Sequence, residues 1–310
     1  RRSCGVEPED SRRPGLTPGS ESPKPSAPKK GNHPPVTAQI QPPSVLLMGA
    51  QGTGKSTYLA TFLDAGVELF VIGTEPNAAD SIMDSIRNNT GAAAGTKPRD
   101  VGKFHFHAVA PAPSGWDEMV AVAEQVRQKS YEDLSKIKDG IGKSKLGHWL
   151  DLLTCCKDFT DDLAGGKSYG DITEWGADRA IVIDSLTGLN EMARQFTVGL
   201  KPSMAQSEWG VAMELEGGLI RKITSDRGCF FVLTAHLDRN VEEASQAVKL
   251  MPAALGNKLA PKITPLFSEV VLSKKVVSGS GAAASTQFRW ATADGMADLK
   301  NRALGLGADL

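Results

Sequence analysis

Residues 49–56 read Gly49-Ala50-Gln51-Gly52-Thr53-Gly54-Lys55-Ser56. They fill every fixed position of the pattern G-x-x-x-x-G-K-[ST], in which a glycine-rich loop cradles a polyphosphate with its main-chain N–H groups. The apolar run 45–48 before the loop predicts a buried strand, and residues 56–63 after it predict a helix. The alternative is a glycine-rich turn with an incidental lysine, but both flanks favour the loop. The stretch therefore predicts a site for a nucleoside triphosphate.

The loop pattern also predicts a role for each polar side chain in it. Lys55 is expected to reach the β- and γ-phosphates of ATP, and the Ser56 hydroxyl to ligate Mg²⁺. The residues expected to contact the nucleotide are Gly49, Ala50, Gln51, Gly52, Thr53, Gly54, Lys55, Ser56 and Thr57.

The composition divides the 310 residues into two parts. Residues 1–43 are rich in Pro, Ser and Gly and poor in large apolar residues, which predicts a disordered tail. The chain does not begin with Met, so this tail is either native sequence or the boundary of a fragment. Residues 44–310 suit a single α/β domain, with a helical insertion expected around 116–165.

The charge and the cysteines exclude several classes of protein. A formal net charge of −1 argues against a basic domain, so any contact with DNA requires a local patch. The four cysteines fit neither a metal-binding spacing nor a secreted disulfide framework. Because the sequence contains no transmembrane run and residues 1–30 contain no signal-peptide core, we expect a soluble, cytoplasmic protein that does not bind a membrane.

Four further apolar runs follow the first strand, and each ends in polar residues. They lie at 67–72, 104–109, 180–183 and 229–233, and helical patterns at 116–129, 146–156 and 207–225 separate them. Alternating short strands and helices predict an α/β fold, with a mostly parallel sheet covered by helices on both faces. Ligands of such sheets bind beyond the carboxyl ends of the strands.

Two carboxylates close strands of this sheet. Asp184 follows a β-branched run and is expected to hold Mg²⁺ together with Ser56, the alternative being a helix cap. Ser185 comes next, so no second carboxylate stands beside the metal ligand. Glu75 closes the second strand and is either the base that polarises the attacking water or a solvated loop residue.

Three histidines and two late cations are further candidates. His236 closes the last strand and either donates to the γ-phosphate or is satisfied by main-chain carbonyls. His105 and His107 alternate on one strand, where we expect structural roles. Lys300 and Arg302 are two residues apart in an expected extended segment, so they face the same side, toward a phosphate or toward solvent.

These features together resemble the RecA-like ATPases, which include RecA, RadA and the DnaB helicase. The likeness covers roughly residues 44–305. The members share a phosphate loop, a strand-ending glutamate, an Asp-Ser metal site, a polar sensor and, in DnaB and RadA, a late Lys-x-Arg. Here these are similar to 49–56, Glu75, Asp184-Ser185, His236 and 300–302. The resemblance implies that Glu75 is the catalytic base and that Lys300 and Arg302 act on a neighbouring subunit. The sensor is usually Gln, so His236 departs from the pattern.

A narrower resemblance is to phage RecA-like ATP-binding proteins of the Sak single-strand-annealing type. The stretches that carry it are 183–187, 208–210, 233–236 and 262–270. It implies a recombination or replication ATPase that binds single-stranded DNA and assembles into rings or filaments. As in RecA, DNA would contact the loops after the fourth and fifth strands, expected near 190–206 and 238–262. The available cations there are Arg194, Lys201, Arg239, Lys249 and Lys258.

The sequence leaves three kinds of function open. The first is an oligomeric, DNA-stimulated ATPase. The second is a nucleotide-dependent switch that binds a protein partner and hydrolyses little ATP. The third is a small-molecule kinase, which is disfavoured because the segment 130–148 lacks the arginines of a kinase lid.

Overall fold

The computed structural model describes residues 41–75, 77–93, 95–109, 116–130, 132–133, 147–199, 201, 203–241, 248–256, 258–279 and 285–302. Nearly all of the expected tail, residues 1–40, lies outside these ranges. Within the range expected to hold a helical insertion, the described residues form the helices α4 (Trp116–Arg127) and α6 (His148–Lys157). A short antiparallel pair follows α6, formed by β4 (Thr160–Asp161) and β5 (Lys167–Ser168).

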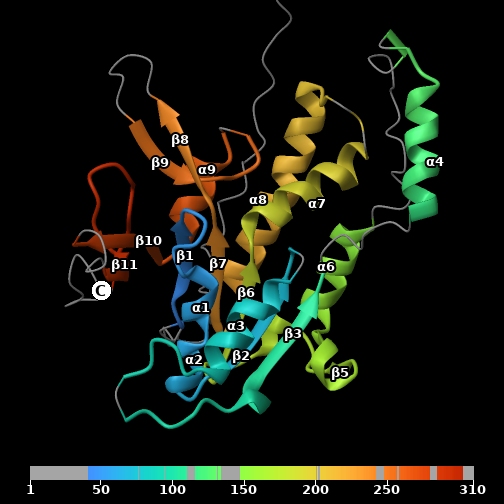
Figure 1. Cartoon of the computed structure of the whole chain (residues 1–310). Helices are drawn as coiled ribbons and strands as arrows, with labels where there is room; N and C mark the ends of the chain where they lie inside the picture. Colours follow the sequence, from blue (N-terminus) through green and yellow to red (C-terminus); the bar gives the residue numbers. More distant parts are fainter. Residues whose placement is uncertain are drawn as a thin grey trace, which may run out of the picture. The chain divides into compact units, whose positions relative to one another are not determined.

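A seven-stranded sheet forms the centre of the described part (Figure 1). Its strands, in spatial order, are β11 (Ser285–Ala291), β10 (Glu269–Ser278), β1 (Ser44–Gly49), β7 (Phe230–Ala235), β6 (Arg179–Asp184), β2 (Glu68–Gly73) and β3 (Phe104–Ala108). Every pairing is parallel except that between β10 and β11. Because β7 lies between β1 and β6, the strand before the glycine loop and the strand that ends at Asp184 are not neighbours. Both nevertheless end at the same edge of the sheet.

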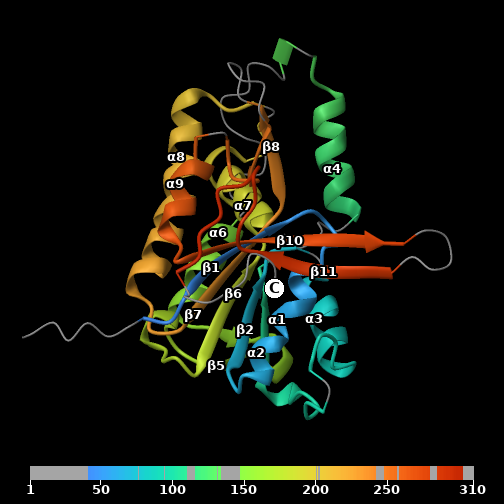
Figure 2. The same ribbon diagram turned by 90° about the vertical axis from the view of Figure 1, so that its left-hand side faces the viewer.

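Helices cover both faces of this sheet, as Figure 2 shows from the side. One face carries α1 (Lys55–Leu59), α2 (Thr61–Asp64) and α3 (Ala78–Arg87), whose apolar side chains pack on Leu47 and Val71. The other carries α6, α7 (Leu186–Val198) and α8 (Gln206–Asp226), which pack on Leu46 and Ile72. Successive strand residues point to opposite faces, so continuous apolar runs fill both layers. The structure confirms the predicted α/β fold with a mostly parallel sheet.

Two antiparallel pairs extend from the core. β8 (Leu237–Val241) and β9 (Val248–Pro252) form a two-stranded ribbon directly after β7. β10 and β11 continue past the end of β1, because Gly49 pairs with Ser273 and five residues of β10 follow it. Figure 2 shows these two strands projecting together beyond the rest of the sheet. The short helix α9 (Ala260–Ile263) and the 3₁₀ turns at Val101–Lys103, Asp162–Ala164, Ile172–Glu174 and Thr264–Leu266 complete the described elements.

In the two segments expected to contact DNA, most of the described residues belong to helices and strands. Helix α7 continues to Val198, so the first loop is limited to the residues between α7 and α8. The second is the β8–β9 ribbon followed by α9. The apolar face of α7, which packs on α8 and the sheet, explains the first difference, since Leu189, Met192 and Ala193 are buried there. No helix in the described ranges combines the length and the apolar character that a membrane crossing requires.

Candidate nucleotide-binding site

The glycine-rich loop joins β1 to α1 at the carboxyl edge of the sheet. Gly52 and Gly54 have φ values of 70° and 85°, a left-handed conformation that side chains rarely adopt. Gly49 is packed closely, since a Cβ there would lie 2.8 Å from the carbonyl oxygen of Ser273 on β10. The backbone of the loop therefore requires glycine at all three positions.

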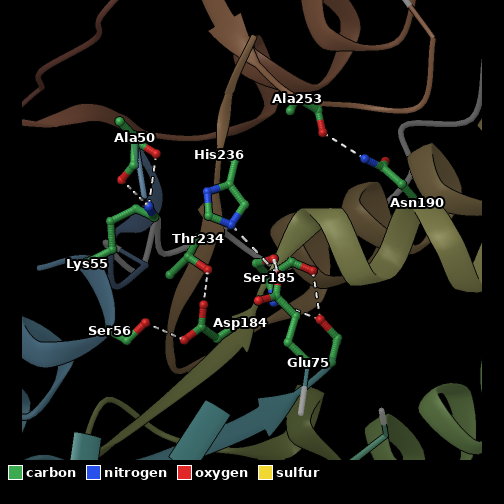
Figure 3. A network of polar contacts seen from close by, with 12 residues as sticks. Ala50, Lys55, Ser56, Glu75, Asp184, Ser185, Asn190, Thr234, His236 and Ala253 are labelled. Atoms are coloured by element: carbon green, nitrogen blue, oxygen red, sulfur yellow. Dashed lines mark hydrogen bonds and ion pairs between the residues drawn. The ribbon is translucent and has the colours of Figure 1, made fainter. Parts of the chain in front are cut away.

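Lys55 points into the loop and is only 7% exposed. Its Nζ donates to the carbonyl oxygens of Gly49 and Ala50, both at 2.9 Å (Figure 3). Burial lowers the pKa of Lys55, and the nearby carboxylates of Asp184 and Glu75 oppose that shift. A phosphate group would give this buried ammonium a charged hydrogen-bond partner in place of neutral carbonyls.

Asp184 ends β6 and faces the loop, with an exposed fraction of 8%. Its Oδ2 accepts a hydrogen bond from Ser56 Oγ at 2.7 Å, and its Oδ1 accepts one from the hydroxyl of Thr234 on β7. A hydroxyl and a carboxylate together are oxygen ligands of the kind that Mg²⁺ uses beside substrate phosphates. Ser56 and Asp184 thus fit the expected metal site.

Glu75 follows β2 and lies across the cavity from the loop. Its Oε1 accepts a hydrogen bond from Ser185 Oγ and lies 3.9 Å from Nε2 of His236 (Figure 3). The preceding residue, Thr74, joins two strand ends: its Oγ1 accepts from Ser185 N at 2.7 Å and donates to Ser185 O at 2.9 Å. Glu75 is therefore held by contacts with the ends of β6 and β7.

These groups line one open cavity of about 290 Å³. Its lining consists of Gln51, Gly52, Thr53, Gly54, Lys55, Ser56, Thr57, Glu75, Asn77, Ala78, Ser81, Asp184 and His236. The loop, Glu75, Asp184 and His236 were all predicted to meet at this edge, and the structure brings them together. Thr234 and Thr74 were not predicted as site residues, although both stand at the ends of predicted strands.

Lys300 and Arg302 lie elsewhere. Lys300 pairs with Val270 near the amino end of β10, and its Nζ donates to the carbonyl oxygens of Phe267 and Pro265 at 2.7 and 3.2 Å. The main-chain N–H of Arg302 donates to Glu269 Oε2 at 3.0 Å. Because β10 is parallel to β1, this end is opposite to the glycine loop. Neither cation lines the cavity of its own chain.

The two histidines of β3 also lie outside the cavity. His105 Nδ1 lies 2.9 Å from Asp161 Oδ2, and His107 Nδ1 lies 3.2 Å from the Thr160 hydroxyl. These contacts connect β3 to β4. Within the described ranges, no group of three or more His, Cys, Asp or Glu residues is arranged to hold a metal ion.

No protein-family model matches the chain, and no curated protein matches it. Among solved structures, it is similar to a KaiC-like protein from the hyperthermophilic archaeon Pyrococcus horikoshii OT3. The two are 13% identical, the match covers 80% of this chain and 78% of the other, and the TM-score is 0.32. A likeness at this TM-score bears on neither substrate nor partner.

Proposed function

We propose that this chain is a Mg²⁺-dependent, RecA-like ATPase. The observation that carries the proposal is the convergence of four segments, distant in sequence, on one cavity. Lys55 and Ser56 come from the loop, Glu75 from the end of β2, Asp184 from β6 and His236 from the end of β7. A buried cation, a carboxylate–hydroxyl pair and a second carboxylate across from them form a set suited to phosphoryl transfer to water.

In this proposal each group has a separate task. The loop N–H groups and Lys55 hold the β- and γ-phosphates, and Ser56 and Asp184 would hold Mg²⁺, which would neutralise charge on the phosphate oxygens. Glu75 accepts a proton from the attacking water. The Ser185 hydroxyl orients the Glu75 carboxylate, and His236, whose Nε2 lies 3.9 Å from the same carboxylate oxygen, donates a hydrogen bond to the γ-phosphate.

We further propose that the ATPase acts on single-stranded DNA as an oligomeric ring or filament, in recombination or replication of the phage Sak type. Support comes from the sequence resemblance and from the position of the β8–β9 ribbon. The ribbon begins at the residue after His236, so a movement of His236 at the phosphate site would move the start of the ribbon directly. It carries Arg239 and Lys249, although Lys249 forms an ion pair with Asp298.

A nucleotide-dependent switch with little hydrolysis is the second candidate. The observation that favours it is the hydrogen bond from Ser185 to Glu75 Oε1, which occupies one oxygen of the proposed base. A Glu75 that stays in this contact when ATP is bound would activate water poorly.

Substitution of Glu75 and Lys55 separates these possibilities. Glu75→Gln retains the shape of the side chain but cannot take a proton, so we expect ATP binding near the native level and turnover reduced by at least about 100-fold. Lys55→Ala should lose ATP binding while keeping the fold. Binding is measured by calorimetry, and phosphate release is measured with and without single-stranded DNA.

The binding and turnover measurements distinguish the proposed roles. Native turnover in Glu75→Gln contradicts the role of Glu75, and unchanged ATP affinity in Lys55→Ala contradicts the phosphate site. A wild-type protein that binds ATP but releases phosphate slowly, with or without DNA, favours the switch. A rate that single-stranded DNA does not alter contradicts the proposed DNA partner.

A further inference from the structure

Three aromatic side chains form a cluster beside the glycine loop. The ring of Tyr58 on α1 meets Phe288 and Trp290 of β11 edge-to-face, with centroid distances of 6.4 and 6.1 Å. Phe288 is 39% exposed, a large value for a phenylalanine packed against other rings. None of these three rings takes part in the phosphate chemistry described above.

The cluster touches the loop directly. A Cβ added to Gly54 would lie 3.1 Å from the Tyr58 ring and 3.5 Å from Phe288. On the other side, a Cβ at Gly91 would lie 2.7 Å from the Tyr58 ring. Tyr58 is therefore held between the phosphate loop and the turn after α3, and Phe288 lies beside it at the surface.

The register of the β10–β11 pair shows which of its faces is turned to the loop. Ser273 is opposite Trp290, and Lys275 is opposite Phe288, so these four side chains share one face. Ser273 Oγ donates to the carbonyl oxygen of Thr53 at 2.8 Å. The face with Phe288 and Lys275 is thus anchored to the phosphate loop at its base.

The order of strands gives the direction of a bound nucleotide. Glu75 follows β2 and Asp184 ends β6, and both strands lie on one side of β1, whereas β10 and β11 lie on the other side. A triphosphate whose γ end is at Glu75 therefore has its nucleoside end toward β10 and β11. Thr57, the residue before Tyr58 on α1, also lines the cavity.

We propose that Phe288, supported by Tyr58 and flanked by Lys275, stacks on the base of the bound nucleotide. This inference rests on the proposed nucleotide binding. It assigns a binding site to the base, which the phosphate site does not contact. Aromatic stacking accepts any base, since every base has a π-face. The site therefore binds adenine and guanine nucleotides with similar affinity.

Calorimetry with three probes tests this inference: ATP, GTP and inorganic tripolyphosphate, each with Mg²⁺. Phe288→Ala and Phe288→Leu should weaken ATP and GTP binding by about 10- to 100-fold. Tripolyphosphate has no base, so both variants should bind it like the wild type. Arg289→Ala is the matched control, because Arg289 is adjacent on β11 but faces the opposite way, and its affinities should not change.

The outcomes separate the base site from the phosphate site. Unchanged ATP affinity in both Phe288 variants overturns the inference and leaves the proposed function intact. Equal loss of ATP and tripolyphosphate affinity also overturns it, because Phe288 would then support the loop. A wild-type preference for ATP over GTP of more than about 100-fold contradicts recognition by stacking alone. If the wild type binds none of the three probes, the proposed function fails first.

Discussion

Glu216 lies in the middle of α8 with no exposed surface. Neither of its carboxylate oxygens has a hydrogen-bond partner within the described part of the chain. Burial raises the pKa of Glu216 to about 8, so its carboxyl is mostly neutral in the folded protein at pH 7. A buried polar group without partners costs about 1–3 kcal/mol, which makes this residue a source of instability.

Replacing Glu216 by Met should therefore stabilise the protein, and the gain should depend on pH. The pKa is about 4.5 in the unfolded chain and is raised in the folded one. The free energy of unfolding of the wild type is therefore highest below pH 4.5, where the carboxyl is neutral in both states. It falls progressively as the pH rises through about 8. Each pH unit between these values costs the wild type about 1.4 kcal/mol.

Urea unfolding at pH 5, 6, 7 and 8 measures this difference. The advantage of Glu216→Met should grow with pH, whereas Glu214→Gln, an exposed substitution on the same helix, should change little at any pH. A Met variant that is less stable than the wild type at pH 8 would show that the carboxylate has an undescribed partner.

At the scale of elements, the first turn of α7 is packed against the end of β2. Gly188 on α7 leaves no space there, since a Cβ would lie 2.1 Å from Thr74 Oγ1 and 2.5 Å from Thr74 Cβ. Thr74 in turn binds Ser185 and precedes Glu75. The position of the proposed base thus depends on how closely one helix approaches one strand.

Gly188→Ala should destabilise the protein by about 1–3 kcal/mol although alanine favours helices, because the added methyl group displaces Thr74. ATP turnover should fall with it. Gly218→Ala on α8 is the control: a Cβ there meets nothing within 4 Å, so it should stabilise by about 0.5–1 kcal/mol. Equal effects of the two substitutions, by urea unfolding, would contradict the steric argument.

At the scale of the whole molecule, the place of Lys300 and Arg302 limits what they can do. They lie at the amino end of β10, away from the cavity of their own chain. Any contact with a γ-phosphate must therefore be made with another copy. The proposed trans role requires an assembly in which this end of one subunit meets the carboxyl edge of the next.

Mixing two inactive variants tests the trans role. Arg302→Ala should bind ATP but hydrolyse it slowly. Glu75→Gln should also bind ATP and hydrolyse it slowly, because its amide cannot take a proton from water. A mixed interface pairs intact Glu75 of one subunit with intact Arg302 of its neighbour, so mixing should restore part of the activity. The double variant Arg302→Ala/Glu75→Gln, mixed with Arg302→Ala, should restore none. Light scattering confirms co-assembly, and a co-assembled but inactive first mixture would leave the pair without a trans role.

The sequence predicted those parts of the site that depend on local order. The glycine loop is contiguous, so its residue types alone predict its conformation and its position between a strand and a helix. Glu75, Asp184 and His236 were found because each closes an apolar run, and parallel strands bring such ends to one edge. Helix α7 was missed in part, because a loop was expected near 190–206 whereas the helix continues to Val198.

The sequence by itself thus determined the α/β class, the phosphate loop and the strand-ending candidates, because hydrophobic periodicity and glycine geometry are local properties. Only the tertiary structure decided which residues are in contact. Thr234 donates a hydrogen bond to Asp184, Ser185 donates one to Glu75, and Phe288 lies beside Gly54. It also decided that Lys300 and Arg302 lie at the opposite end of the sheet. These contacts depend on strand order and register, which arise from packing between residues far apart in the chain and leave no local pattern.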